Sequence, residues 1–147
     1  MVRESMGLVI GILLFINLLN PLKAEDKKYT ITGNIHFYGK GNIHIFLVNE
    51  KIFKNPLTGL QTIILAVDQS NFGNTRISFD FQGVRTGTYG IRCFQDTNGN
   101  GKLDRGLFGP SEPWGMSWNS ERASRWPRFE NITFQVDSDM YLNMELK

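Results

Sequence analysis

The sequence contains little of the chemistry on which most small enzymes and metalloproteins depend. It has one cysteine, Cys93, and two histidines, His36 and His44, in 147 residues. A single cysteine excludes an internal disulfide, so a hydrophobic core must hold the fold together. Two histidines are too few for a zinc site without a third ligand. Cys93 alternates with apolar neighbours in 89–93, which predicts a buried small hydrophobic side chain rather than a reactive thiol.

Excess charge and catalytic motifs are also scarce. The formal net charge is +2, which is too weak a field to attract phosphates, so we do not expect nucleic acid as a partner. The sequence has no GxSxG, no HExxH and no phosphate-cradling glycine loop. We therefore expect a protein that is not an enzyme.

Long hydrophobic runs are limited to one segment near the N-terminus. Residues 7–19 are apolar except for Asn17, follow Arg3 and lead to Ala24. A bilayer span takes about 20 apolar residues, so this run is too short. A basic start, an apolar core and a small exit residue predict a secretory signal peptide at 1–24, with a buried core helix as the alternative. We expect an exported protein, periplasmic or extracellular, with no stable membrane span in 25–147, which forms a single domain.

Strand periodicity is what the sequence has in abundance. Apolar and polar residues alternate in 29–37, 43–47, 77–81, 87–95, 132–136 and 140–146, and 62–67 is a continuous apolar run. Alternation predicts one buried and one solvated face on each strand. The turn 39–42 favours a β-hairpin between the first two segments, with His36 and His44 able to face each other. About seven short strands predict an all-β fold, a single antiparallel Greek-key sandwich.

One interval, 96–130, interrupts this rhythm. It shows no strand pattern, and loops this long in a compact domain are usually functional. It contains all three tryptophans, Trp114, Trp118 and Trp126. We favour the interpretation that these rings anchor the loop to the sandwich. The alternative is ligand contact, since exposed aromatic rings contact sugars and are enriched at protein-binding hot spots; a glycan or surface protein is then the candidate partner.

The loop begins with a motif typical of cation binding. In Asp96-x-Asn98-x-Asn100-Gly101-x-x-Asp104, oxygen-bearing side chains occupy alternate positions, a glycine permits a sharp turn, and a second acid follows. Carboxylate and amide oxygens are the ligands that Ca²⁺ prefers, and this order matches positions 1, 3, 5, 6 and 9 of an EF-hand loop.

The motif departs from an EF-hand at position 12, where Leu107 replaces the bidentate glutamate. The last ligands must come from elsewhere. Glu112 is the first candidate because it carries charge, and Ser111 or loop carbonyls are others. The sequence thus predicts a structural Ca²⁺ held by Asp96, Asn98, Asn100, the Lys102 backbone carbonyl, Asp104 and Glu112. The alternative is a plain polar turn, because Asn, Asp and Gly accept turn conformations without a metal.

A series of spaced motifs accompanies the loop: Gly87-Thr88-Tyr89-Gly90-Ile91, the run from Phe94 to Asp104, Gly109-Pro110, Glu112-Pro113, Trp114-Gly115-Met116-Ser117 and Pro127-Arg128-Phe129-Glu130. Together, over about residues 28–147, they resemble domain-of-unknown-function family 2141. The resemblance implies a secreted bacterial β-sandwich of the transthyretin-like or immunoglobulin-like kind, and it implies no activity. Trp114 and Met116 stand where that family often has Tyr and Phe, and Arg105-Gly106 fall in a variable stretch.

Overall fold

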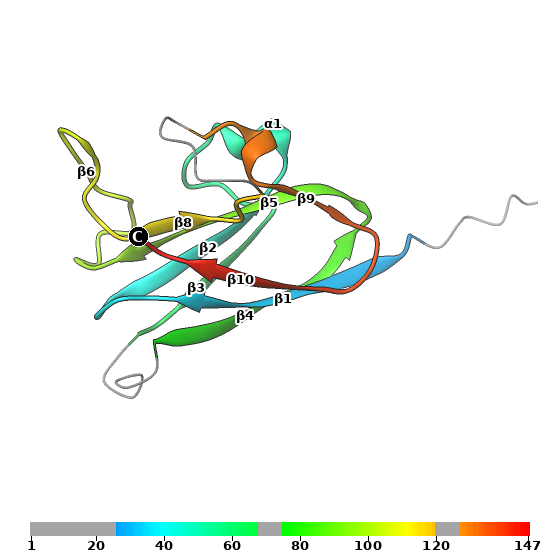
Figure 1. The fold of residues 1–147 in the computed structure, drawn as a ribbon, viewed down its shortest axis with the longest axis horizontal. Helices are drawn as coiled ribbons and strands as arrows, with labels where there is room; N and C mark the ends of the chain where they lie inside the picture. The colour runs from blue at the N-terminus through cyan, green and yellow to red at the C-terminus, as the bar shows by residue number, and fades with distance from the viewer. Residues whose placement is uncertain (1–25, 68–74, 120–126) are drawn as a thin grey trace, which may run out of the picture.

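The protein is a β-sandwich in which two sheets pack face to face (Figure 1). The computed structural model describes residues 26–67, 75–119 and 127–147. The expected signal peptide 1–24 and Trp126 lie outside the described residues, so both stay predictions. The described part of the chain contains no helix with the length and hydrophobicity needed to cross a bilayer.

Two sheets and a small hairpin contain the strands of the described residues. The first sheet has the order β10-β1-β4, and the second has the order β3-β2-β5-β8, with β9 also paired to β5. Strands β6 and β7 pair only with each other. The strand bounds are Lys28–His36 (β1), Asn42–Val48 (β2), Gln61–Leu65 (β3), Arg76–Arg85 (β4), Gly87–Asp96 (β5), Arg105–Gly106 (β6), Gly109–Pro110 (β7), Trp114–Met116 (β8), Thr133–Val136 (β9) and Met140–Glu145 (β10). A helix, α1, spans Glu50–Phe53, and a 3₁₀ helix spans Phe129–Asn131.

The main core lies between the two sheets, and alternation explains how it forms. Successive side chains of a strand point to opposite faces, so Ile31 and Ile35 of β1 point inward and are 0 % exposed. They meet inward residues of the other sheet. The cluster comprises Ile31, Ile35, Phe37, Ile43, Ile45, Leu47, Val67, Phe79, Phe81, Val84, Ile91, Cys93, Val136, Met144 and Leu146. Cys93 is buried as predicted, and burial raises the pKa of its thiol to about 12.

The predicted hairpin between the first two strands is wrong. β1 pairs with β4 and β10, whereas β2 pairs with β3 and β5, so the two strands belong to different sheets. The turn that joins them has Gly39 at φ 72° and Gly41 at φ 127°, which suits glycine. This turn carries the chain across the sandwich. His36 and His44 therefore do not face each other.

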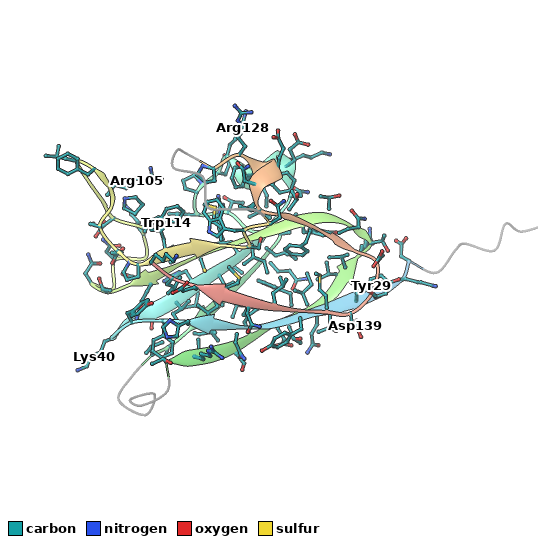
Figure 2. The ribbon with its side chains drawn as sticks, in the orientation of Figure 1. Tyr29, Lys40, Arg105, Trp114, Arg128 and Asp139 are labelled. Carbon is teal, nitrogen blue, oxygen red and sulfur yellow. The ribbon has the colours of Figure 1, made fainter. Side chains whose placement is uncertain are left out.

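The expectation of a wholly antiparallel sandwich is also wrong at one pair. β1 and β10 run parallel, with Ile31 opposite Met140 and His36 opposite Glu145. The chain enters β10 from β9, which lies in the other sheet, so β10 reaches β1 by a crossover and not by a hairpin. Asp139 Oδ1 accepts a hydrogen bond from Thr30 N at 2.8 Å where the pair begins, and Asp139 lies beside Tyr29 in Figure 2. The all-β sandwich class is confirmed, and the Greek-key connectivity stays a prediction.

The outer face of the second sheet is covered, although alternation predicts one solvated face on each strand. Every residue of β2 after Asn42 is buried, so this strand has no solvated face. A second cluster, Phe46, Val48, Phe94 and Ile132, lies on the outward side and is covered by Ile52, Phe53, Leu103, Trp114, Met116, Trp118 and Phe129. We call these covering segments, 50–60, 97–118 and 129–132, the covering layer. The 96–130 interval also holds β6, β7 and β8, so the prediction that it lacks strands is wrong.

Candidate functional site

The last residue of β5 forms the base of the predicted cation loop. Asp96 is only 3 % exposed, although it is an acid. Its Oδ1 accepts hydrogen bonds from Gly99 N at 2.8 Å and Asn100 N at 3.1 Å, and its Oδ2 accepts one from Gly101 N at 2.8 Å. Gly99 and Gly101 have φ of 74° and 75°, a backbone conformation that glycine adopts without strain. The glycines therefore let the loop turn its N–H groups toward one carboxylate.

These hydrogen bonds set the charge state of Asp96. Burial by itself raises the pKa of this carboxyl group, because it disfavours the charged form. The backbone N–H groups of Gly101, Gly99 and Asn100, together with the attraction of His44, lower it by more. The pKa of Asp96 is therefore below the ordinary aspartate value, and a buried negative charge stands at the centre of the loop.

The second acid of the motif is held by the two asparagines. Asp104 accepts hydrogen bonds from Asn98 Nδ2 at 2.6 Å and from Asn100 Nδ2 at 3.0 and 3.1 Å. The amide oxygens turn the other way: Asn98 Oδ1 accepts from Asn100 N at 3.1 Å, and Asn100 Oδ1 accepts from Lys102 N at 2.8 Å. The structure thus brings all five predicted loop residues into one hydrogen-bonded network.

Glu112 joins this network from eight residues beyond Asp104. It is 6 % exposed. Its Oε1 accepts hydrogen bonds from Thr97 N at 2.8 Å and Thr97 Oγ1 at 2.9 Å, and its Oε2 accepts one from Asp104 N at 3.1 Å. Glu112 therefore clamps both ends of the loop. Glu112, the first candidate for the missing ligand, therefore lies against the loop, and its role as a cation ligand stays a prediction.

The oxygen atoms of this network are of the kind that bind a hard cation, but some side chains would have to rotate to present them. Carboxylate and amide oxygens are Ca²⁺ ligands, and three acids and two amides lie in this network. Within residues 26–67, 75–119 and 127–147, however, no three His, Cys, Asp or Glu side chains form a metal-holding group. A cation would need amide and backbone oxygens as well. The amide groups of Asn98 and Asn100 would have to rotate, because their nitrogens now face Asp104.

Comparison with known proteins assigns the chain to a family. The family model described as "Uncharacterized protein conserved in bacteria (DUF2141)" matches residues 36–142. The chain belongs to this family. No curated protein matches it. Among solved structures it is similar to the crystal structure of a DUF3823 family protein from Parabacteroides merdae ATCC 43184, with 12% identity and a TM-score of 0.35 over 84% of this chain and 47% of that chain. The chain thus spans about half the length of that protein.

Sequence reasoning missed one residue at the base of the loop in this DUF2141 protein. Alternation in 43–47 places His44 on the face predicted to be solvated, but His44 is 8 % exposed, and its ring stacks on Phe94 with centroids 4.7 Å apart. Its Nε2 is 3.6 Å from Asp96 Oδ2 and has no hydrogen-bond partner in the described structure. The register pairs His44 with Phe94 and Asn42 with Asp96, so His44 and Asp96 are diagonal neighbours on one face. Only knowledge of the β2–β5 pairing could have shown this.

The tryptophans that the structure describes belong to the covering layer. Trp114 and Trp118 pack against the second cluster and contact each other edge to face, with ring centroids 6.2 Å apart. Both are half-buried, as the anchoring interpretation expects. Trp118 also lines a surface cavity of ≈ 270 Å³ with Met116, Asn143, Met144, Glu145 and Lys147.

Proposed function

We propose that this DUF2141 protein is an exported, non-catalytic β-sandwich whose 96–104 loop binds Ca²⁺ as a structural ion. The observation that carries the proposal is the convergence of the loop on two buried acids. Asp96 gathers three backbone N–H groups, and Glu112 holds the start and end of the same loop. A loop whose backbone already wraps around buried carboxylates needs little further backbone ordering to bind a cation, although the amide groups of Asn98 and Asn100 would have to rotate.

The residues that would hold the ion are Asp96, Asn98, Asn100, the Lys102 carbonyl, Asp104 and Glu112. Glu112 has limited capacity, because each carboxylate oxygen has two lone pairs. Oε1 already accepts two hydrogen bonds and Oε2 only one, so Oε2 is the oxygen that remains for a cation. The ion would neutralise Asp96 and Asp104 and hold the covering layer in place.

Thermal unfolding tests the calcium site directly. After chelation, added Ca²⁺ should raise the melting temperature, because a ligand of the native state stabilises it by mass action. Asp96→Ala and the milder Asp104→Asn should abolish the rise. Asp137→Ala, which removes an exposed acid outside the loop, should keep it. The absence of any metal-dependent shift in the parent protein would leave the plain polar turn as the correct interpretation.

The non-catalytic and exported parts of the proposal have separate support. The Cys93 thiol is buried and its pKa is raised to about 12, so it is a poor nucleophile. His36 and His44 lie in different sheets, so they are not paired across a hairpin as the sequence allowed. Export rests on the sequence of 1–24 and is tested by cell fractionation with mass spectrometry of the N-terminus; an unprocessed cytoplasmic chain would refute it.

A second candidate function is a binding module for a glycan or surface protein. The cavity beside Trp118 favours it, because an aromatic ring and the polar residues Asn143, Glu145 and Lys147 line the same hollow. Aromatic faces with nearby hydrogen-bonding groups suit sugar rings. Soluble glycans should then quench tryptophan fluorescence, and Trp118→Phe should weaken the effect. Fluorescence that neither glycans nor acrylamide can quench would reject this function.

A further inference from the structure

The β6–β7 hairpin carries two large apolar side chains at its tip, and neither is buried. Leu107 is 96 % exposed and Phe108 is 104 % exposed. The other exposed large apolar residues that the structure describes reach at most 57 %, at Ile64. Water-exposed apolar surface of this kind is unfavourable unless a partner covers it. These two residues therefore contribute nothing to the core and require a different explanation.

The composition of the tip is also unusual for a turn. Arg105 pairs with Pro110 and Gly106 with Gly109, which leaves Leu107 and Phe108 as the two turn residues. Two-residue hairpin turns are normally built from Asn, Asp and Gly, whose conformations match the twist of the strands. Leu107 and Phe108 both have negative φ, since the described residues include no non-glycine residue at positive φ. Turn formation therefore does not explain why apolar residues occupy these positions.

The hairpin projects from the molecule and is braced at its base. Figure 1 shows it extending away from both sheets, and a Cβ atom added at Gly106 would have Gly109 O, at 3.9 Å, as its nearest neighbour beyond the adjacent residues. Ser111 N donates to Asp104 O at 2.9 Å, and Asp104 N donates to Glu112 Oε2 at 3.1 Å. Leu103 packs against the second cluster. These contacts at the base of the hairpin hold its tip away from the sandwich in the protein alone, without a bound partner.

We propose that the Leu107-Phe108 tip inserts into the interfacial region of a phospholipid bilayer that carries anionic headgroups. A convex pair of side chains fits a fluid interface, which needs no complementary pocket. One aromatic side chain buries about 150–250 Å², so this pair falls far short of the roughly 800 Å² per partner of a stable protein interface.

The charges beside the tip agree with an anionic surface. Lys102 and Arg105 are exposed, and Figure 2 shows Arg105 on the hairpin. The one acid between them, Asp104, is half-buried and accepts amide hydrogen bonds. Basic residues near a membrane surface are attracted to anionic lipids, and apolar insertion and charge act together. The inference does not rest on the calcium site, because the hairpin is braced by hydrogen bonds within the protein.

Vesicle binding in EDTA tests this proposal apart from the calcium site. The protein is purified from cells that produce and process the whole chain, and mass spectrometry verifies that all variants share one N-terminus. It is floated with vesicles of equimolar phosphatidylglycerol and phosphatidylethanolamine, and with vesicles of phosphatidylcholine. The parent protein should bind the anionic vesicles more tightly. Leu107→Ser/Phe108→Ser should lower the partition coefficient by about 100-fold.

Matched controls separate insertion from a general loss of apolar surface. Leu60→Ser/Ile64→Ser removes two half-exposed apolar side chains elsewhere and should leave binding unchanged. Lys102→Gln/Arg105→Gln should weaken binding to anionic vesicles by about 5-fold per charge. With F108W, brominated lipids should quench the fluorescence of the introduced tryptophan.

The proposal is overturned if the parent protein does not bind vesicles, or if the Leu107→Ser/Phe108→Ser tip variant binds them equally well. Self-association that the tip variant abolishes would assign the tip to a second copy of the chain instead.

Discussion

Glu112 is the side chain whose removal should most clearly separate the loop from the sandwich. Its carboxylate accepts three hydrogen bonds, two from Thr97 and one from Asp104 N. Glu112→Ala removes all three at once and leaves the rest of the chain unaltered. Because the test is made in EDTA, it measures the protein's own hydrogen bonds and not a bound cation.

The expected magnitude follows from the surroundings of these donors. A hydrogen bond to a charged group contributes about 1.5–3 kcal/mol. Thr97 is exposed and Asp104 is half-buried, so water can replace part of the lost hydrogen bonding. In addition, folding of the variant no longer removes a carboxylate from water, which offsets part of the loss. We therefore expect Glu112→Ala to lower the free energy of unfolding by about 3 kcal/mol. Glu112→Gln should lower it by about 1.5 kcal/mol, because the amide still accepts from Thr97 but presents an N–H group to Asp104 N.

Urea unfolding followed by tryptophan fluorescence measures both variants. Glu145→Gln makes the same chemical change at an exposed acid whose contacts are Tyr38 Oη and Lys147 Nζ, and it should change stability by less than about 1 kcal/mol. Thr97→Val removes one of the donors, so a double-mutant cycle with Glu112→Ala should give a coupling of about 1 kcal/mol. If Glu112→Ala were within about 1 kcal/mol of the parent protein, the carboxylate would not be holding the loop.

Two further predictions follow from the side chains of β5. The lowered pKa of Asp96 means that its contribution to stability is complete above the unfolded-state pKa and is lost as the pH falls through the folded-state pKa. In EDTA, urea unfolding across acid pH should show a steep loss for the parent protein and a shallower one for Asp96→Asn; parallel curves would contradict this. Arg92 donates to the carbonyls of Phe53, Asn55 and Thr58, so Arg92→Lys should lower the unfolding free energy by about 1–2 kcal/mol, because an ammonium group lacks the planar fork. An unchanged urea midpoint would show that these bonds contribute nothing.

Strand periodicity predicted most of the fold but not the way in which strands pair. The segments 29–37, 77–81 and 87–95 lie within or close to β1, β4 and β5, because alternation is a local property of the chain. Pairing is not local. The 39–42 turn is short enough for a hairpin. Ile35 and Ile45, however, belong to opposite sheets and are buried in the same core between them, which favours a turn that crosses from one sheet to the other. Nothing in the turn itself distinguishes these outcomes.

The hydrogen-bonded turn at 96–104 was predictable because its residues lie close together in sequence, whereas cation binding there stays a prediction. Alternate Asp and Asn residues with glycines at 99 and 101 fix the turn locally, and Glu112, the nearby acid beyond the motif, contacts both ends of it. His44 and the covering of the outer sheet face depend on contacts between segments distant in sequence, which period-2 patterns do not report. The exposure of Leu107 and Phe108 was not predictable either, because two apolar residues in a loop sequence can be either buried or exposed.

The outward face of β5 explains why the loop, Trp114, Trp118 and helix α1 belong to one layer. Arg92, Phe94 and Asp96 occupy alternate positions, so all three point away from the main core. Arg92 donates to carbonyls at the end of α1 and beyond it, Phe94 stacks on His44 and belongs to the cluster beneath Trp114, and Asp96 accepts the N–H groups of the loop. A shift of β5 by one residue would turn all three inward. The β2–β5 register therefore positions the whole covering layer, and a cation bound at Asp96 would stabilise that layer at the end of the strand that organises it.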